Sequence, residues 1–148
     1  MRLEHTDSHH SDFKLLVKEL DNTLAVTDGD DHAFYDQFNK LDHLNNVIVA
    51  YEDGIPVGCA ALKKYDTQSM EIKRMYTRNN YRGKGIASSI LNELEKWTAA
   101  LGFKRCILET GVNQREAIAL YKKSGYELIK NYGPYAGVEN SFCFEKKV

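Results

Sequence analysis

The feature that most restricts the fold of this chain is a pair of glycines between a strand-like run and the longest helix-like run. Residues 69–77 form the strand-like run, and Gly83 and Gly85 follow it in the segment Arg82-Gly83-Lys84-Gly85. Apolar and small residues then recur at the spacing of one helix face: Ile86, Ile90, Leu91, Leu94, Trp97, Thr98 and Leu101. Gly102 supplies the stop signal of that helix. This arrangement predicts a layered α/β domain.

The residues before this turn predict a helical part and a hairpin. Apolar residues at helical spacing follow Ser8: Phe13, Leu16, Val17, Leu20 and Leu24. Residues 27–31, which include the acidic Asp28, Asp30 and Asp31, are expected to end that helix. A second short helix is expected to carry Phe34, Phe38 and Leu41. The strand-like runs 47–51 and 55–62 flank Asp53-Gly54, and an Asp-Gly pair between strands is a strong hairpin signal.

The residues after the long helix complete the order of elements. Residues 106–110 indicate a buried strand, and a helix is expected to follow with Asn113 as its N-cap and Glu116 as the capping-box partner. Residues 126–129 and 141–145 are typical of two final strands. The order is then β-α-α-β-β-β-α-β-α-β-β. It predicts one domain over residues 1–148, with a mixed, mostly antiparallel sheet flanked by helices.

Composition narrows the class of protein. A chain of 148 residues suits one compact domain, and a net charge of −1 provides no basic field for nucleic acid. No apolar run is long enough to span a membrane, and residues 1–6 lack the apolar core of a signal peptide. Three cysteines, Cys59, Cys106 and Cys143, lie in strand-like runs and suit reduced core thiols. We therefore expect a cytoplasmic protein without a metal site, and a homodimer is left open.

The glycine turn has the chemistry of an anion site. The first amide groups of a helix have no partner within the helix, and the helix dipole adds positive potential there. Glycines let the backbone approach a ligand, while Arg82, Lys84 and Ser88 add cationic and hydroxyl donors. The pattern matches neither a nucleotide-triphosphate P-loop nor the Gly-x-Gly-x-x-Gly fingerprint of dinucleotide-binding proteins. The alternative is a tight turn without a ligand.

Several motifs together resemble the GNAT superfamily of N-acetyltransferases. The first is Arg-x-x-Gly-x-Ala at Arg82, Gly85 and Ala87, preceded by the strand of residues 71–77. A second block consists of residues 108–110, Asn113, residues 117–121 and residues 124–126. The resemblance extends from about residue 47 to residue 129. It implies the fold of that family and the transfer of an acetyl group from acetyl-CoA to a primary amine.

The resemblance also implies roles for individual residues. The cofactor pyrophosphate would be held by the backbone amides of a continuous segment with Ser88 nearby: Arg82, Gly83, Lys84, Gly85, Ile86 and Ala87. The pantetheine arm would lie along Met75, Tyr76 and Thr77, and an amide near Met75 or Tyr76 would polarise the thioester carbonyl. Asn113 would contact the pantetheine or an active-site water, and the Tyr121 hydroxyl would protonate the departing thiolate.

Alternatives stay open for two of these catalytic candidates. Tyr121 could instead be a helix tyrosine whose ring packs against the sheet. Glu71 stands where some family members have a catalytic glutamate that deprotonates the acceptor, but it could equally be a solvent-facing strand carboxylate. A covalent route through cysteine is disfavoured, because all three cysteines are expected in the core. Direct attack of the amine on the acetyl group within a ternary complex is therefore expected.

The sequence says least about the acceptor. Alternation along the strand places Glu71, Lys73 and Met75 on one face, and Arg74 and Tyr76 on the other with Ile72. Lys73 or Arg74 could bind an acceptor carboxylate, although both could instead pair with glutamates or cofactor phosphates. Tyr132 and Tyr135, in a glycine-containing loop, are candidate walls of the acceptor pocket. A small amine resembling an amino acid is preferred, with a protein acetyltransferase or a non-catalytic acetyl-CoA-binding module as the alternatives.

Overall fold

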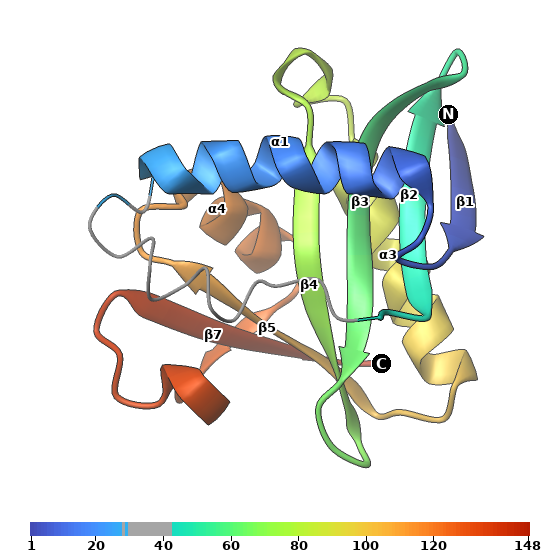
Figure 1. Ribbon diagram of the computed structural model, residues 1–148. Helices are drawn as coiled ribbons and strands as arrows, with labels where there is room; N and C mark the ends of the chain where they lie inside the picture. The colour runs from blue at the N-terminus through green and yellow to red at the C-terminus, as the bar shows by residue number, and fades with distance from the viewer. Residues whose placement is uncertain (28, 30–42) are drawn as a thin grey trace. The chain divides into compact units, whose positions relative to one another are not determined.

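The computed structural model describes residues 1–27, 29 and 43–148 (Figure 1). The strands are β1 (Arg2–Thr6), β2 (Asn46–Glu52), β3 (Ile55–Lys64), β4 (Ser69–Thr77), β5 (Arg105–Gly111), β6 (Glu127–Ile129) and β7 (Ser141–Lys147). The helices are α1 (Ser11–Thr27), α3 (Ile86–Ala100) and α4 (Arg115–Lys123), with single 3-10 turns η2 (Asn79–Tyr81) and η3 (Gly133–Tyr135). The strands are hydrogen-bonded in the order β1-β2-β3-β4-β5-β7-β6.

The expected α/β class and mixed sheet are confirmed. The second short helix expected around Phe34, Phe38 and Leu41 and the acidic residues Asp28, Asp30 and Asp31 lie outside the described residues.

The chain divides into two compact units. The first unit comprises Met1–Lys63 and Ile72–Leu94, and the second comprises Lys64–Glu71 and Glu95–Val148. Strand β4 and helix α3 each begin in one unit and end in the other. The expectation of a single N-acetyltransferase domain over residues 1–148 stays a prediction.

In the first unit, α1 covers one face of the strands β2, β3 and the end of β4 (Figure 1). The residues that α1 buries are Phe13, Leu16, Val17 and Leu20, four of the five apolar positions that predicted this helix. Phe13, Leu16 and Val17 pack with strand residues into a core that includes Val47, Val49, Cys59 and Ala61. The hairpin between β2 and β3 turns at Asp53 and Gly54, whose φ angles of 50° and 78° are those of a type I′ turn.

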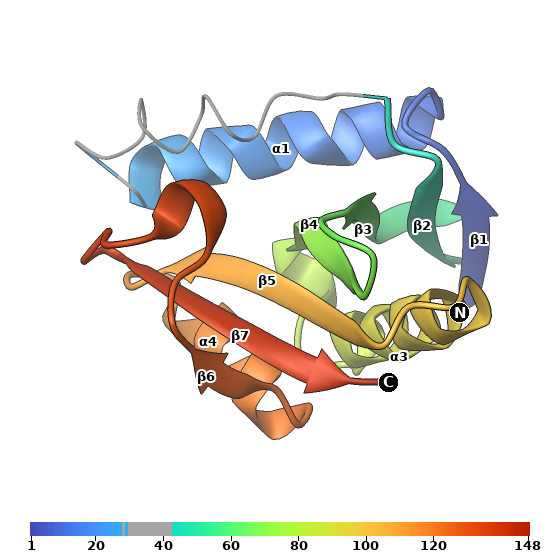
Figure 2. The ribbon, with the colours of Figure 1, turned by 90° about the horizontal axis from the view of Figure 1, so that it is seen from below.

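The start of α3 lies on the opposite face of these strands (Figure 2). Gly58 in β3 makes this close approach possible. A Cβ atom at Gly58 would lie 3.0 Å from the Tyr76 carbonyl oxygen, 3.2 Å from Ile90 Cδ1 and 3.3 Å from Ile86 Cγ2. The lack of a side chain at position 58 therefore sets the depth at which the first turns of α3 pack on the sheet.

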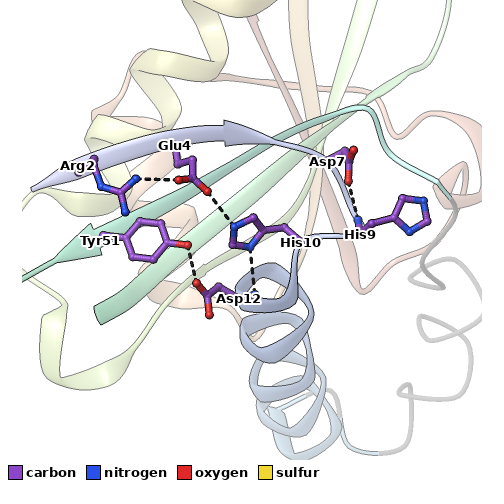
Figure 3. Close-up of polar contacts among 7 residues, drawn as sticks. All are labelled: Arg2, Glu4, Asp7, His9, His10, Asp12 and Tyr51. Carbon is purple, nitrogen blue, oxygen red and sulfur yellow. Dashed lines mark hydrogen bonds and ion pairs between the residues drawn. The ribbon is translucent and has the colours of Figure 1, made fainter. Parts of the chain in front are cut away.

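A polar network fixes the start of α1 (Figure 3). The His10 Nδ1 atom accepts a hydrogen bond of 3.1 Å from the Asp12 amide, so His10 caps the helix with its own ring. Its other nitrogen, Nε2, lies 2.9 Å from the Glu4 carboxylate on β1. Tyr51 on β2 donates a hydrogen bond of 2.6 Å to Asp12 Oδ2. These contacts tie His10 and the first turn of α1 to β1 and β2.

In the second unit, the beginning of β4 pairs in parallel with β5, and β7 lies between β5 and β6 as an antiparallel neighbour of both. Helix α4 packs through Tyr121, whose ring centroid lies 6.2 Å from that of Phe144 in β7. The predicted N-cap of α4 is wrong. Asn113 belongs to a turn closed by the Gln114 amide bonding to the Gly111 carbonyl at 3.0 Å, so the cap position is Gln114 and no side chain caps the helix. Asn113 is therefore not the cap residue of a capping box.

All three cysteines are free and buried, which confirms their assignment as core thiols. Among the residues that the structure describes, no helix has the length and apolar character needed to cross a membrane.

Candidate functional site

The turn between β4 and α3 is open at both glycines. Gly83 and Gly85 have φ angles of 77° and 81°, and a Cβ atom added to either would have no heavy atom within 4 Å. Residues other than glycine are strained at such angles, so the conformation explains both glycines. The side chain of Arg82 folds back, and its Nε donates a hydrogen bond of 3.0 Å to the Thr77 carbonyl. The turn is thereby tied to the end of β4.

The start of α3 has the geometry of an anion site. Gly85 is the cap residue, because its carbonyl accepts the first helical hydrogen bond, from the Ser89 amide at 3.0 Å. The amides before Ser89 have no partner within the helix. The Ser89 hydroxyl donates a hydrogen bond of 2.9 Å to the Gly85 carbonyl, whereas Ser88 is exposed. The Lys84 ammonium group lies 5.3 Å from the centre of the Tyr81 ring. An open glycine turn with cationic side chains fits a pyrophosphate.

Strand β4 has an irregular backbone at Arg74, whose φ angle is 59°. The thiol of Cys59 bonds to the Arg74 carbonyl oxygen at 3.4 Å. The side chains of Arg74 and Tyr76 both reach α1, where they contact Asp21 and Glu19. The alternation predicted for these two residues is therefore retained despite the irregularity. Met75 and Lys73 are half-buried, and Thr77 is buried.

Glu71 is buried, with 8% of its surface exposed. It is therefore not the solvent-facing carboxylate of the alternative interpretation. Tyr132 donates a hydrogen bond of 2.7 Å to Glu71 Oε2. Burial and the Glu71 carboxylate raise the pKa of Tyr132 far above its ordinary value, so this hydroxyl keeps its proton. The Tyr132 ring lies edge-on to Tyr65, with centroids 5.0 Å apart, and to the buried Tyr135 at 6.0 Å.

Tyr121 has a buried ring and an uncommitted hydroxyl. Its ring packs against Tyr126 as well as Phe144, which agrees with the core-packing interpretation. Its hydroxyl has no hydrogen-bond partner among the described residues. Burial, with a smaller contribution from Glu109, raises the pKa of Tyr121 and keeps the hydroxyl protonated. Asn113, eight residues earlier, is exposed in the turn before α4.

Sequence reasoning missed two polar residues. Asp21 on α1 bonds to Arg74, and Gln114 has a buried Nε2 atom without a hydrogen-bond partner among the described residues. Gln114 was overlooked because the sequence analysis assigned the N-cap of α4 to Asn113 instead. The sequence did not indicate that Asp21 contacts Arg74, because a charged residue on an amphipathic helix is normally solvated.

The predicted site residues fall into two groups, each within one unit. The first unit contains Lys73, Arg74, residues 75–77 and the turn of residues 82–88. The second unit contains Glu71, Asn113, Tyr121, Tyr132 and Tyr135. Among the described residues, no cluster of three or more His, Cys, Asp and Glu side chains could hold a metal ion.

Comparison with known proteins identifies the family. Residues 13–126 match the model of the acetyltransferase (GNAT) family. The chain belongs to the GNAT family. This confirms the resemblance drawn from residues 82–87 and 108–126.

GNAT relatives resemble the chain in sequence and in structure. An IAA acetyltransferase of Azospirillum brasilense is 38% identical over 101 residues, which are 67% of this chain and 65% of that protein. This chain thus spans a little less than two thirds of that relative. An acyl-CoA N-acyltransferase candidate from Klebsiella pneumoniae has a TM-score of 0.82 at 24% identity, covering 99% of this chain and 96% of its own. The PaiA N-acetyltransferase of Thermoplasma acidophilum, solved with coenzyme A, has a TM-score of 0.72 at 21% identity and full coverage of both chains. These structural likenesses establish the fold.

Proposed function

We propose that this chain transfers the acetyl group of acetyl-CoA to the primary amine of a small molecule, by direct attack of the amine. The single observation that carries the proposal is the open turn at Gly83 and Gly85 before α3. The Arg82 amide already donates to the Asn79 carbonyl at 3.3 Å, so the pyrophosphate of acetyl-CoA, the cosubstrate of the family, is left the amides from Gly83 onward. The cations Arg82 and Lys84 add favourable charge. Bound there, acetyl-CoA supplies the activated acetyl group.

The chain's own side chains supply proton transfer. An amine attacks only after losing its proton, because an ammonium group has no lone pair. Glu71 is the proposed base, held in place by the hydrogen bond from Tyr132. Tyr121 is the proposed acid, since its hydroxyl keeps its proton and has no partner among the described residues. Each contribution is expected to be about 10²–10⁴-fold.

A covalent cysteine route is not part of the proposal. Burial raises the pKa of Cys59 to about 12 and those of Cys106 and Cys143 to about 11. A nucleophilic cysteine needs thiolate at neutral pH, which these environments disfavour. Free thiols also suit a reducing compartment, so the proposed location is the cytoplasm.

A small acceptor suits the surroundings of Glu71. Glu71 is buried and accepts a hydrogen bond from Tyr132, whose ring in turn contacts the rings of Tyr65 and Tyr135. A compact amine can be enclosed by such rings. Lysine-containing peptides are the competing acceptors.

Thermal-shift titration tests the cofactor part of the proposal. Acetyl-CoA should raise the Tm of the protein, and ATP or NAD should raise it less, because only a ligand of the native state stabilises it. Gly85→Glu should abolish the shift, since it adds bulk and negative charge to the anion site. Gly102→Glu is the matched control: Gly102 also has a positive φ and open space around it, but lies just after the last turn of α3. Equal loss of the shift in both variants would contradict the proposed site.

Release of free coenzyme A thiol tests the reaction. The wild-type protein should release thiol faster with small amines than without an acceptor, and Gly85→Glu should not. Turnover of lysine peptides with none of small amines would contradict the small-molecule acceptor. Binding of acetyl-CoA without turnover of any amine would indicate a non-catalytic module.

A further inference from the structure

Arg74 is buried and only partly hydrogen-bonded. Its side chain is 3% exposed, and within the described part of the chain one hydrogen bond leaves its side chain, from Nη2 to Asp21 Oδ1 at 2.5 Å. The buried Nε and Nη1 atoms have no partner among the described residues. A guanidinium group carries one hydrogen on Nε and two on each terminal nitrogen, so three N–H groups are left without an acceptor.

Arg78 provides an internal comparison. It too connects the β4 region with α1, but all three of its nitrogens are bound. Nε and Nη2 donate to the two carboxylate oxygens of Glu19 at 2.9 Å and 2.6 Å, and Nη1 donates to the Pro56 carbonyl at 2.9 Å. Arg78 has the bonding of a structural arginine. Arg74 does not, although it is the more deeply buried of the two.

Arg74 also has an unfavourable backbone conformation. Its φ angle of 59° is one that residues other than glycine adopt at a cost of about 1–3 kcal/mol. Leaving buried donors unpaired adds a further cost. Two unfavourable features at one residue, on the strand that leads into the cofactor turn, are typical of a functional position.

The unpaired donors define the chemistry of a ligand. They require oxygen acceptors. Asp21 compensates the charge of Arg74 incompletely, because its carboxylate is 43% exposed and therefore solvated. A buried and incompletely compensated guanidinium favours an anion, and arginine binds planar carboxylates especially well. The favoured ligand is therefore a carboxylate.

The chain position of Arg74 connects this carboxylate with the acceptor. Arg74 is directly followed by Met75 and Tyr76, and the family resemblance implies that an amide near one of these two residues polarises the thioester carbonyl. We propose that Arg74 binds the carboxylate of the acceptor, which is therefore an amino acid or a similar amine with a carboxylate near the reacting nitrogen. This inference rests on the proposed function. Asp21 is a positioning residue that fixes the guanidinium group through Nη2.

Matched substrates test the proposal. The kcat/KM for coenzyme A release should be measured with a panel of L-amino acids and with their carboxamides. Arg74→Met should lower kcat/KM for the acids by about 10–100-fold, the value of hydrogen bonds to a charged group, and for the amides only slightly. Each variant is compared with wild type within one series, so the different amine pKa values of acids and amides cancel. Asp21→Asn should reduce kcat/KM for the acids less than Arg74→Met does.

Three results would overturn the inference. The first is an equal loss for acids and amides in Arg74→Met. The second is the same selective loss in Arg78→Met or Lys73→Met, which serve as controls for a general effect of charge or of the contact with α1. The third is a wild-type protein that turns over amides as well as acids. In each case coenzyme A release would persist, so the proposed function would stand.

A binding measurement covers the case in which Arg74→Met does not fold. In the wild-type protein with coenzyme A present, an N-acetyl amino acid should raise the Tm more than its carboxamide does. Equal shifts would contradict a carboxylate site at Arg74. Absence of any response to coenzyme A or acetyl-CoA would instead contradict the proposed function itself.

Discussion

Tyr121 and Tyr126 belong to one aromatic cluster, with ring centroids 5.9 Å apart, but their hydroxyl groups differ. Tyr126 donates a hydrogen bond of 2.9 Å to Glu95, whereas Tyr121 has no partner among the described residues. Removing a hydroxyl that has no hydrogen-bond partner in the described part of the chain should cost little stability. This difference separates a catalytic role from a structural one within a single cluster.

Tyr121→Phe should lower kcat by about 10²-fold or more and leave Tm and acetyl-CoA affinity near the wild-type values. The ring packing survives, and only the proton donor is lost. Tyr126→Phe is the control, and it should lower the free energy of unfolding by about 1 kcal/mol without a comparable effect on kcat. Undiminished kcat in Tyr121→Phe would leave this tyrosine a core-packing role alone.

Glu71→Gln should lower kcat/KM at neutral pH by about 10²-fold or more, and the loss should shrink as the pH rises. The reason is that amines with pKa values of about 8–10 lose their proton without help at high pH. Tyr132→Phe keeps the carboxylate and removes its hydrogen bond, so it should have a smaller effect. A loss that stays constant between neutral and alkaline pH would argue against Glu71 as the base.

At the residue scale, the sequence predicts backbone-determined features better than side-chain environments. Gly83 and Gly85 could be predicted because only glycine suits such a turn before a helix. The state of Arg74 could not, because its positive φ and its contact with Asp21 depend on how α1 packs on β4. The burial of Glu71 likewise depends on Tyr132, 61 residues later.

At the scale of elements, hydrophobic periodicity was sufficient for most boundaries. Strand β4 begins and ends where residues 69–77 predicted, and α3 has the predicted start at Ile86 and stops before Gly102. The prediction of the α4 N-cap was wrong because asparagine is favoured both in turns and at N-caps, and Asn113 lies in a turn. The close contact of Gly58 with α3 was also not predicted from the sequence, because a glycine in a strand can mark a bulge, a bend or a close approach.

Gly58→Ala should destabilise the protein by about 1–3 kcal/mol and weaken acetyl-CoA binding. The added Cβ atom would press on Ile86 and Ile90 and displace the start of α3, where the cofactor turn ends. Urea unfolding and a binding titration measure the two effects. The double variant Gly58→Ala with Ile90→Val removes Cδ1 of Ile90 and should recover part of both, so absence of recovery would contradict this packing.

At the scale of the whole molecule, the fold class, the order of the described elements and the family followed from the sequence, because they depend on periodicity and on motifs close together in the chain. The division into two compact units did not. Nothing in the composition of β4 or α3 marks the points at which each passes from one unit into the other.

The three cysteines give the whole molecule a pH dependence. Their native pKa values of about 11–12 exceed the value of about 8.5 in an unfolded chain. The native state therefore holds protons that the unfolded state loses above pH of about 8.5, so this stabilisation is present below that pH and is lost as the pH rises towards 11–12. Each thiol should contribute a loss of up to about 1.4 kcal/mol per pH unit. Urea unfolding should show a smaller alkaline loss in a variant with all three cysteines replaced by alanine, and an equal loss would contradict burial of the thiols.

The placement of these thiols also makes them natural reporters of local opening. Cys59 belongs to the first unit, whereas Cys106 and Cys143 belong to the second. A thiol reagent reacts with a buried cysteine only when the surrounding structure opens, so each labelling rate reports the opening free energy of its own surroundings. Equal rates would indicate one cooperative opening, and different rates would rank the two units by their local stability. Mass spectrometry of the labelled protein would thus measure the internal dynamics without an introduced probe.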